Sequence, residues 1–179
     1  MNLQPAVLAA AIVTAGLAMA PVAQAVTQGR VIKAQGGPAC QLSVPTTATT
    51  VRPRATGIRN EGTTSAYVIC QSESSTGELT GIQMYVTSID GTPRNVTCTA
   101  VNGYNIAPSL MNIAYSPKTL ATDSSGGIVA IFDWVATDFG GAAAGDNFPN
   151  SGWSSVTCLL PPQTAINLFA VFYNEDVGA

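Results

Sequence analysis

Hydrophobic and polar residues alternate along much of the chain with a period of two, which is typical of β-strands and not of helices. The clearest case is a triplet of valine, any residue and cysteine, which occurs at Val68–Cys70, Val96–Cys98 and Val156–Cys158. The segment Cys40–Val44 alternates in the same way. Residues two apart on a strand share a face, so we expect four strands to point the four cysteines into one interior.

Turn signals separate the remaining segments and predict an all-β fold. Ile82–Val86 and Val96–Ala100 alternate on either side of Asp90-Gly91, which predicts a β-hairpin. Ile128–Ala136 is apolar on both faces, which predicts a strand at the centre of a sheet. Roughly nine or ten short strands without a long helical stripe favour a single antiparallel β-sandwich or jelly-roll-like domain. This domain is expected to span residues 26–179.

An apolar run at Ala6–Ala20 precedes the segment Ala23-Gln24-Ala25. The run is too short for a comfortable membrane span, and small residues stand where a signal peptidase requires them. We therefore expect residues 1–25 to be a secretory signal peptide that is cleaved after Ala25. An N-terminal membrane anchor is the alternative, because no Lys or Arg precedes the run. The predicted location is extracytoplasmic, secreted or periplasmic, with no membrane attachment after cleavage.

Composition excludes several classes of function. Charged residues make up 9% of the chain and the net charge is −3, without the basic footprint of a nucleic-acid-binding protein. The chain has no histidine, which excludes Ser-His-Asp and Cys-His relays and the histidine zinc motifs. We expect neither a cofactor nor a metal site.

Four cysteines in an exported chain predict two disulfides. A cysteine metal site is the alternative, which the lack of Cys-x-x-Cys spacing disfavours. Three pairings are open, and we favour Cys40 with Cys70 and Cys98 with Cys158 because both close moderate loops. The chain-entropy model gives each roughly 3.5–4.5 kcal/mol of stabilisation.

Several short segments resemble small secreted proteins of Gram-negative bacteria that have no assigned activity. The segments are Gly57–Asn60, Ala66–Cys70, Val156–Pro161 and Glu175–Ala179. The resemblance implies export and a disulfide-bonded β-fold, and it implies no chemistry.

Two features are candidates for function. Asp133 interrupts an apolar strand, which indicates either an acid with a raised pKa or, as we favour, a structural or sheet-edge residue. The glycine-rich loop Asp138–Trp153 combines aromatic and polar residues. If the loop binds a sugar, we expect Phe148 and Trp153 to stack on the sugar rings and Asp146 and Asn147 to supply polar contacts. The alternative, which we favour, is an ordinary surface loop whose aromatic side chains pack into the core.

These observations favour an exported non-catalytic protein: a structural, surface-associated or binding module. Its expected partner is a carbohydrate or another surface protein. The alternative is a small polysaccharide-acting enzyme, which would need two carboxylates at a defined separation.

Overall fold

The computed structural model describes residues 25–44, 50–71, 78–105, 111–122, 130–150 and 153–178. The predicted signal peptide therefore lies outside the described residues, apart from Ala25. Within the described ranges, no helix has the length and apolar character needed to cross a membrane.

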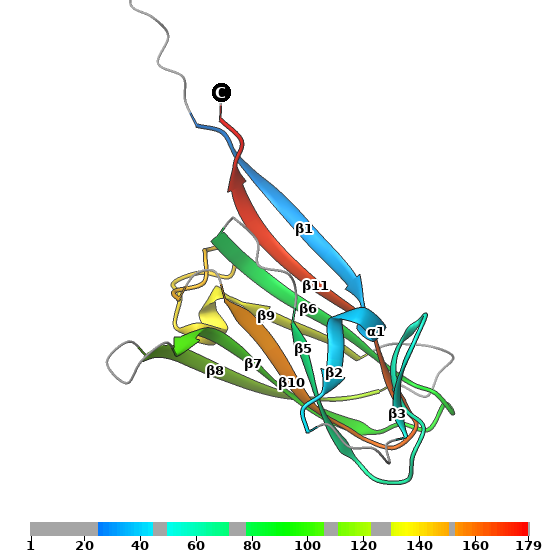
Figure 1. Ribbon diagram of the computed structural model, residues 1–179. Coiled ribbons are helices and arrows are strands. Elements are labelled where there is room, and N and C mark those ends of the chain that lie inside the picture. Colours follow the sequence, from blue (N-terminus) through cyan, green and yellow to red (C-terminus); the bar gives the residue numbers. More distant parts are fainter. Residues whose placement is uncertain are drawn as a thin grey trace, which may run out of the picture.

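Two antiparallel sheets contain all the described strands (Figure 1). Sheet A contains β1 (Thr27–Gln35), β3 (Val51–Arg54), β4 (Gly57–Asn60), β6 (Glu78–Ser88), β9 (Ala130–Val135) and β11 (Thr164–Asp176). Sheet B contains β2 (Cys40–Leu42), β5 (Ala66–Gln71), β7 (Asn95–Asn105), β8 (Met111–Ala121) and β10 (Ser154–Leu160). The described helices are the single turns α1 (Gly36–Ala39) and η1 (Ala136–Phe139). The all-β sandwich prediction is confirmed.

The long strand β11 organises sheet A. It pairs with β6 along one side, and with β4 and then β1 along the other, which gives the order β3-β4-β11-β6-β9 with β1 beside β11. The outer ends of β1 and β11, where Thr27 pairs with Asp176 and Gln28 with Glu175, extend past the last residue pair of β11 with β6 (Figure 1). Sheet B has the order β2-β5-β10-β7-β8.

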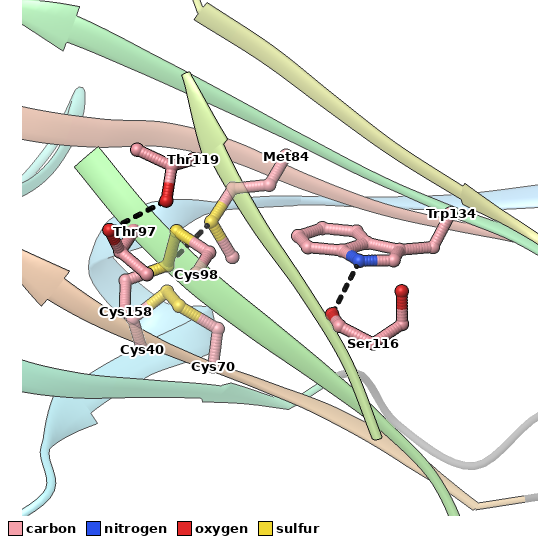
Figure 2. The surroundings of a disulfide bond; sticks show 9 residues. All are labelled: Cys40, Cys70, Met84, Thr97, Cys98, Ser116, Thr119, Trp134 and Cys158. Carbon is pink, nitrogen blue, oxygen red and sulfur yellow. Dashed lines mark hydrogen bonds between the residues drawn. A yellow bond between two sulfur atoms is a disulfide. The ribbon is translucent and has the colours of Figure 1, made fainter. Parts of the chain in front are cut away.

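The valine–cysteine triplets lie on three adjacent strands of sheet B, where Cys158 faces Val68 on one side and Cys98 on the other. Disulfides join Cys40 to Cys70 and Cys98 to Cys158, which is the pairing favoured from the sequence. All four cysteines are buried and turned towards sheet A. The Sδ atom of Met84 on β6 lies 3.3 Å from the Cys158 Sγ atom, so the sulfur atoms help to fill the space between the sheets (Figure 2).

The predicted hairpin around Asp90-Gly91 is wrong, because β6 belongs to sheet A and β7 to sheet B. The chain does reverse there: Asp90 accepts hydrogen bonds from the Thr92 N–H and the Arg94 side chain. Arg94 then pairs through its backbone with Thr122, which follows β8 in sheet B. An Asp-Gly turn specifies a reversal of direction, and it does not specify which sheet receives the next strand.

The prediction of a central strand over Ile128–Ala136 is also wrong in its described part. Strand β9 is an edge strand, since it pairs with β6 alone among the described strands. Phe132 and Trp134 point inward and stack at 5.6 Å, whereas Ile131 is 48% exposed on the outer face. The Trp134 Nε1 atom donates to the Ser116 carbonyl of β8 at 2.9 Å, which links the adjacent edges of the two sheets (Figure 2). Exposed apolar residues are common on protein surfaces, so an edge strand with apolar residues on its outer face has the same sequence pattern as a strand that is buried on both faces.

Candidate functional site

The structure separates the four residues of the predicted binding loop. Phe148 is only 2% exposed, and its ring lies 4.7 Å from that of Phe139 in the core. Its ring therefore presents no face to solvent, which is a correction to its expected stacking role. The buried pair of rings anchors the loop between β9 and β10.

Asp146 and Asn147 lie where the loop folds back onto sheet A. The Asp146 Oδ2 atom accepts a hydrogen bond from the Ala143 N–H at 2.8 Å, within the loop. Asn147 donates to the Glu78 carboxylate and accepts from the Asn174 side chain at 3.0 Å. The two contacts of Asn147 hold the loop against β6 and β11. A contact of Asp146 or Asn147 with a ligand stays a prediction.

Trp153 lies on the other sheet. Its carbonyl accepts a hydrogen bond from the Gly103 N–H of β7 at 3.1 Å, so its backbone continues β10 in sheet B. Its side chain is 62% exposed. The loop thus connects an edge of sheet A to the middle of sheet B, and Trp153 is not brought together with Asp146 and Asn147.

A shallow groove of about 290 Å³ lies on the outer face of sheet A. We call it the sheet A groove, and its lining residues come from β6, β9, β11 and the loop: Thr80, Gly81, Gln83, Asp133, Val135, Ala144, Gly145, Phe172 and Asn174. It therefore combines Asp133 with the glycine-rich loop, the two features that the sequence indicated separately.

Register and residue size explain the groove. Gly81 pairs with Phe172 on one side and with Val135 on the other, so the floor lacks a side chain between them. Two residue pairs further along, and so on the same outer face, Gln83 faces Asp133 across β6 and β9. The loop residues Ala144 and Gly145 add a further wall.

The polar groups of the groove are suited to hydroxyl groups. The Asp133 carboxylate is exposed and forms no hydrogen bond or ion pair with any described residue. Gln83 and Asn174 add amide groups, Thr80 adds a hydroxyl group, and Phe172 adds a half-buried ring. Of the lining residues in the described part of the chain, Asp133 alone has a carboxylate.

Sequence reasoning missed Thr80, Gln83, Phe172 and Asn174. Their signal was the alternation in β6 and the last strand, which marked them as outward-facing without showing that β6 lies between β9 and β11. Long-range strand pairing brings these side chains together.

The strongest charge interactions lie away from this groove. Hydrogen bonding to Arg94 holds the pKa of the Asp90 carboxyl well below its usual range. Hydrogen bonding to Arg54 likewise lowers the pKa of Glu61. Within the described part of the chain, no group of three or more His, Cys, Asp or Glu side chains is arranged to hold a metal ion.

Comparisons with known proteins identify no family, since no family model and no curated protein matches the chain. Among solved structures, the GH26-CBM35 β-(1,4)-mannanase of Podospora anserina matches 79% of this chain with 12% identity and a TM-score of 0.37. The chain covers 27% of that structure. A Family 11 carbohydrate-binding module from Clostridium thermocellum, in complex with a β-1,3-1,4-mixed-linked tetrasaccharide, has 12% identity and a TM-score of 0.35. That match covers 84% of this chain and 89% of the module. Likeness at this level carries no argument about function, which rests on the chemistry of the site.

Proposed function

We propose that this protein is an exported, non-catalytic module that binds a saccharide in the sheet A groove. The observation that carries the proposal is the convergence of a carboxylate without a partner among the described residues, two amides, a hydroxyl group and an aromatic ring around one shallow hollow. These groups come from three strands of a single sheet, so the scaffold fixes their relative positions.

The groove offers the two kinds of contact that a sugar ring requires. Asp133 accepts hydrogen bonds from sugar hydroxyls, and the amides of Gln83 and Asn174 both donate and accept them. The ring of Phe172 offers an apolar face to the C–H groups of the sugar. A shallow and exposed groove supports modest affinity, about millimolar to micromolar, or about −4 to −8 kcal/mol.

The lining also argues for binding over hydrolysis. Glycoside hydrolysis requires an acid and a second carboxylate at a defined separation. Asp133 has no second carboxylate beside it among the described residues that line the groove. Its role in the proposal is therefore that of a hydrogen-bond acceptor.

The test is a glycan array with the mature, oxidised protein, followed by calorimetry on the saccharides that bind. Asp133→Asn should weaken binding about tenfold or more, because it removes a charge-assisted hydrogen bond. Gly81→Val should also weaken binding by filling the floor. An added Cβ atom at position 81 has room, because nothing lies closer to it than 3.4 Å, and the urea midpoint of the variant shows whether the rest of the valine side chain is accommodated.

Asp146→Asn is the matched control, because it removes the same charge from the neighbouring loop outside the groove lining. The proposal fails if no glycan binds, or if folded Asp133→Asn and Gly81→Val proteins bind like the wild type. Loss of binding in Asp146→Asn alone would instead place the ligand on the loop. Release of reducing ends from a bound glycan would favour the enzyme.

A further inference from the structure

The outer face of sheet B differs from that of sheet A in its charge. The cysteines and valines of the triplets point inward from even-numbered positions, so odd-numbered positions point outward. None of the outward positions in β5 or β10, in residues 95–103 of β7 or in residues 113–121 of β8 is acidic or basic. Sheet A, in contrast, has Asp133 and the cross-strand pair Arg52 and Arg59 on its outer face.

Trp153 stands beside a hollow on this uncharged face. The hollow has a volume of about 150 Å³, and its lining residues are Ile69, Gln71, Val101, Gly103, Trp153, Ser154 and Ser155. A second hollow of about 170 Å³ shares Ile69 and Gln71 and extends to Pro38 in α1. The two hollows therefore lie on either side of a ridge formed by β5.

The backbone holds the Trp153 ring in an exposed position. Trp153 faces Gly103 of β7, which has no side chain and a φ of +116°. Any Cβ atom at position 103 would collide with the Asn112 carbonyl of β8, so this position requires glycine. The buried Asn102 side chain donates to the carbonyls of Asn150 and Trp153, at 3.2 and 3.4 Å, and accepts from the Asn150 N–H at 3.1 Å.

We propose that the hollow beside Trp153 is a second saccharide-binding site, specific for an uncharged sugar. The exposed indole supplies a stacking face, and Gln71 and Ser155 supply an amide and a hydroxyl group. Neither of these two side chains has a hydrogen-bond partner within the described residues, so both are available to a ligand. A uronate or an amino sugar would bring a charge against strand positions that, within the described residues of this face, offer no counter-charge, which is unfavourable.

This site stands on the opposite face from the sheet A groove and does not depend on it. A protein with both sites holds two saccharide segments on opposite faces of one sandwich. If one of the two sites proves not to bind saccharide, the other can still be tested with its own variants.

The two tryptophans of the chain provide a selective readout, because Trp153 is 62% exposed and Trp134 is fully buried. Neutral oligosaccharides should protect the Trp153 fluorescence of the mature protein from quenching by iodide. Acidic oligogalacturonides at the same concentration should give little protection. Gln71→Ala should weaken the protection at least about fivefold, a loss of about 1 kcal/mol.

Two controls identify the site. Thr119→Ala, on the same face but outside the hollow, and Asp133→Asn, in the sheet A groove, should both leave the protection unchanged. Trp153→Phe retains a ring and should keep the binding that calorimetry measures in the wild type, whereas Trp153→Ala should lose the part of this binding that belongs to the hollow and keep the part that belongs to the sheet A groove.

Four results would overturn the proposal. Two of them concern the wild type: neutral saccharides at millimolar concentration give no protection from iodide, or acidic saccharides protect equally well. The other two concern variants: Asp133→Asn loses the protection, or a folded Trp153→Ala protein binds saccharide as the wild type does. Sedimentation of the wild type as a dimer that Trp153→Ala dissociates would show that this face binds a second copy instead.

Discussion

Replacement of Asn60 tests how the two sheets are joined. Asn60 is the last residue of β4 and is fully buried. Its Nδ2 group donates to the carbonyls of Thr64 at 2.8 Å and of Leu160 at 2.9 Å, and its Oδ1 atom accepts from the Gly62 N–H at 3.0 Å. One side chain in sheet A thus fixes a turn and the end of β10 in sheet B.

The size of the effect follows from these three bonds. Asn60→Ala removes about 1 kcal/mol for each hydrogen bond and leaves buried backbone groups unpaired, so we expect a loss of about 3–4 kcal/mol. Asn60→Asp keeps the shape but places a carboxylate against the carbonyls of Thr64 and Leu160. At neutral pH we expect it to cost more stability than Asn60→Ala. The two carbonyl groups cannot donate a hydrogen bond to the buried carboxylate, and their oxygen atoms repel its negative charge.

The Asn60→Asp variant adds a dependence on pH that the Asn60→Ala variant lacks. Burial should raise the folded-state pKa of the introduced carboxyl group above its unfolded value of about 4. Stability should then be greatest below pH 4, where the protonated acid can donate to one carbonyl, and should fall as the pH rises towards the folded-state pKa.

The assay is urea unfolding between pH 3.5 and 7 of the wild type, both variants and Asn112→Asp. Asn112 is exposed, so the last variant makes the same change in charge without burial. The reasoning is refuted if Asn60→Ala costs less than about 1 kcal/mol, or if Asn60→Asp gains no stability relative to Asn112→Asp as the pH falls.

Three further predictions concern the stability of the sandwich. Replacing Cys98 and Cys158 by Ala should cost about 4 kcal/mol in urea unfolding, about 0.6 kcal/mol more than removing the other disulfide, because the sequence separations are 60 and 30 residues; equal or reversed costs would contradict this. Lys118→Met should cost about 1–2 kcal/mol of stability, because the Lys118 ammonium group joins the adjacent edges of the two sheets. It donates hydrogen bonds to the Asp133 carbonyl and to the Asp138 carboxylate in η1. An unchanged urea midpoint would argue against this role. The hydrogen-bonded ion pair with Arg94 lowers the pKa of Asp90 in the folded state. The stability difference between the wild type and Asp90→Asn should therefore be constant above about pH 4 and become smaller below it. A stability difference that grows as the pH falls would contradict this assignment.

The parts of the fold that were predicted from the sequence are those set by local alternation. The triplets placed each cysteine on the same face as its valine, and the structure has both residues buried in sheet B. The disulfide pairing was favoured on loop length, and the structure explains it by strand pairing, since Cys40 faces Cys70 and Cys98 faces Cys158 across neighbouring strands. Alternation of period two is a property of the strand itself, so it needs no knowledge of neighbours.

Strand neighbours were not predictable in the same way. The alternation of β6 and β7 around Asp90-Gly91 is what a hairpin requires, but it is equally what two facing strands of different sheets require, since both bury one face. Apolar outward residues such as Ile131 likewise led to the prediction of a central strand where the structure has an edge strand. Which strand lies beside which depends on the whole core and not on the turn.

The candidate sites show the same limit more sharply, because sequence proximity was the wrong guide to spatial proximity. Asn147 and Trp153 are six positions apart, yet the loop carries one against sheet A and delivers the other to the outer face of sheet B. Conversely, Gln83, Asp133 and Phe172 line one groove although about 40 or more residues separate each from the next. The residue that shapes this groove is Gly81, whose missing side chain matters only because β9 and β11 flank β6 on its two sides. A glycine in a strand marks a place where something can approach the backbone closely, and only the pairing of the strands shows what surrounds that place.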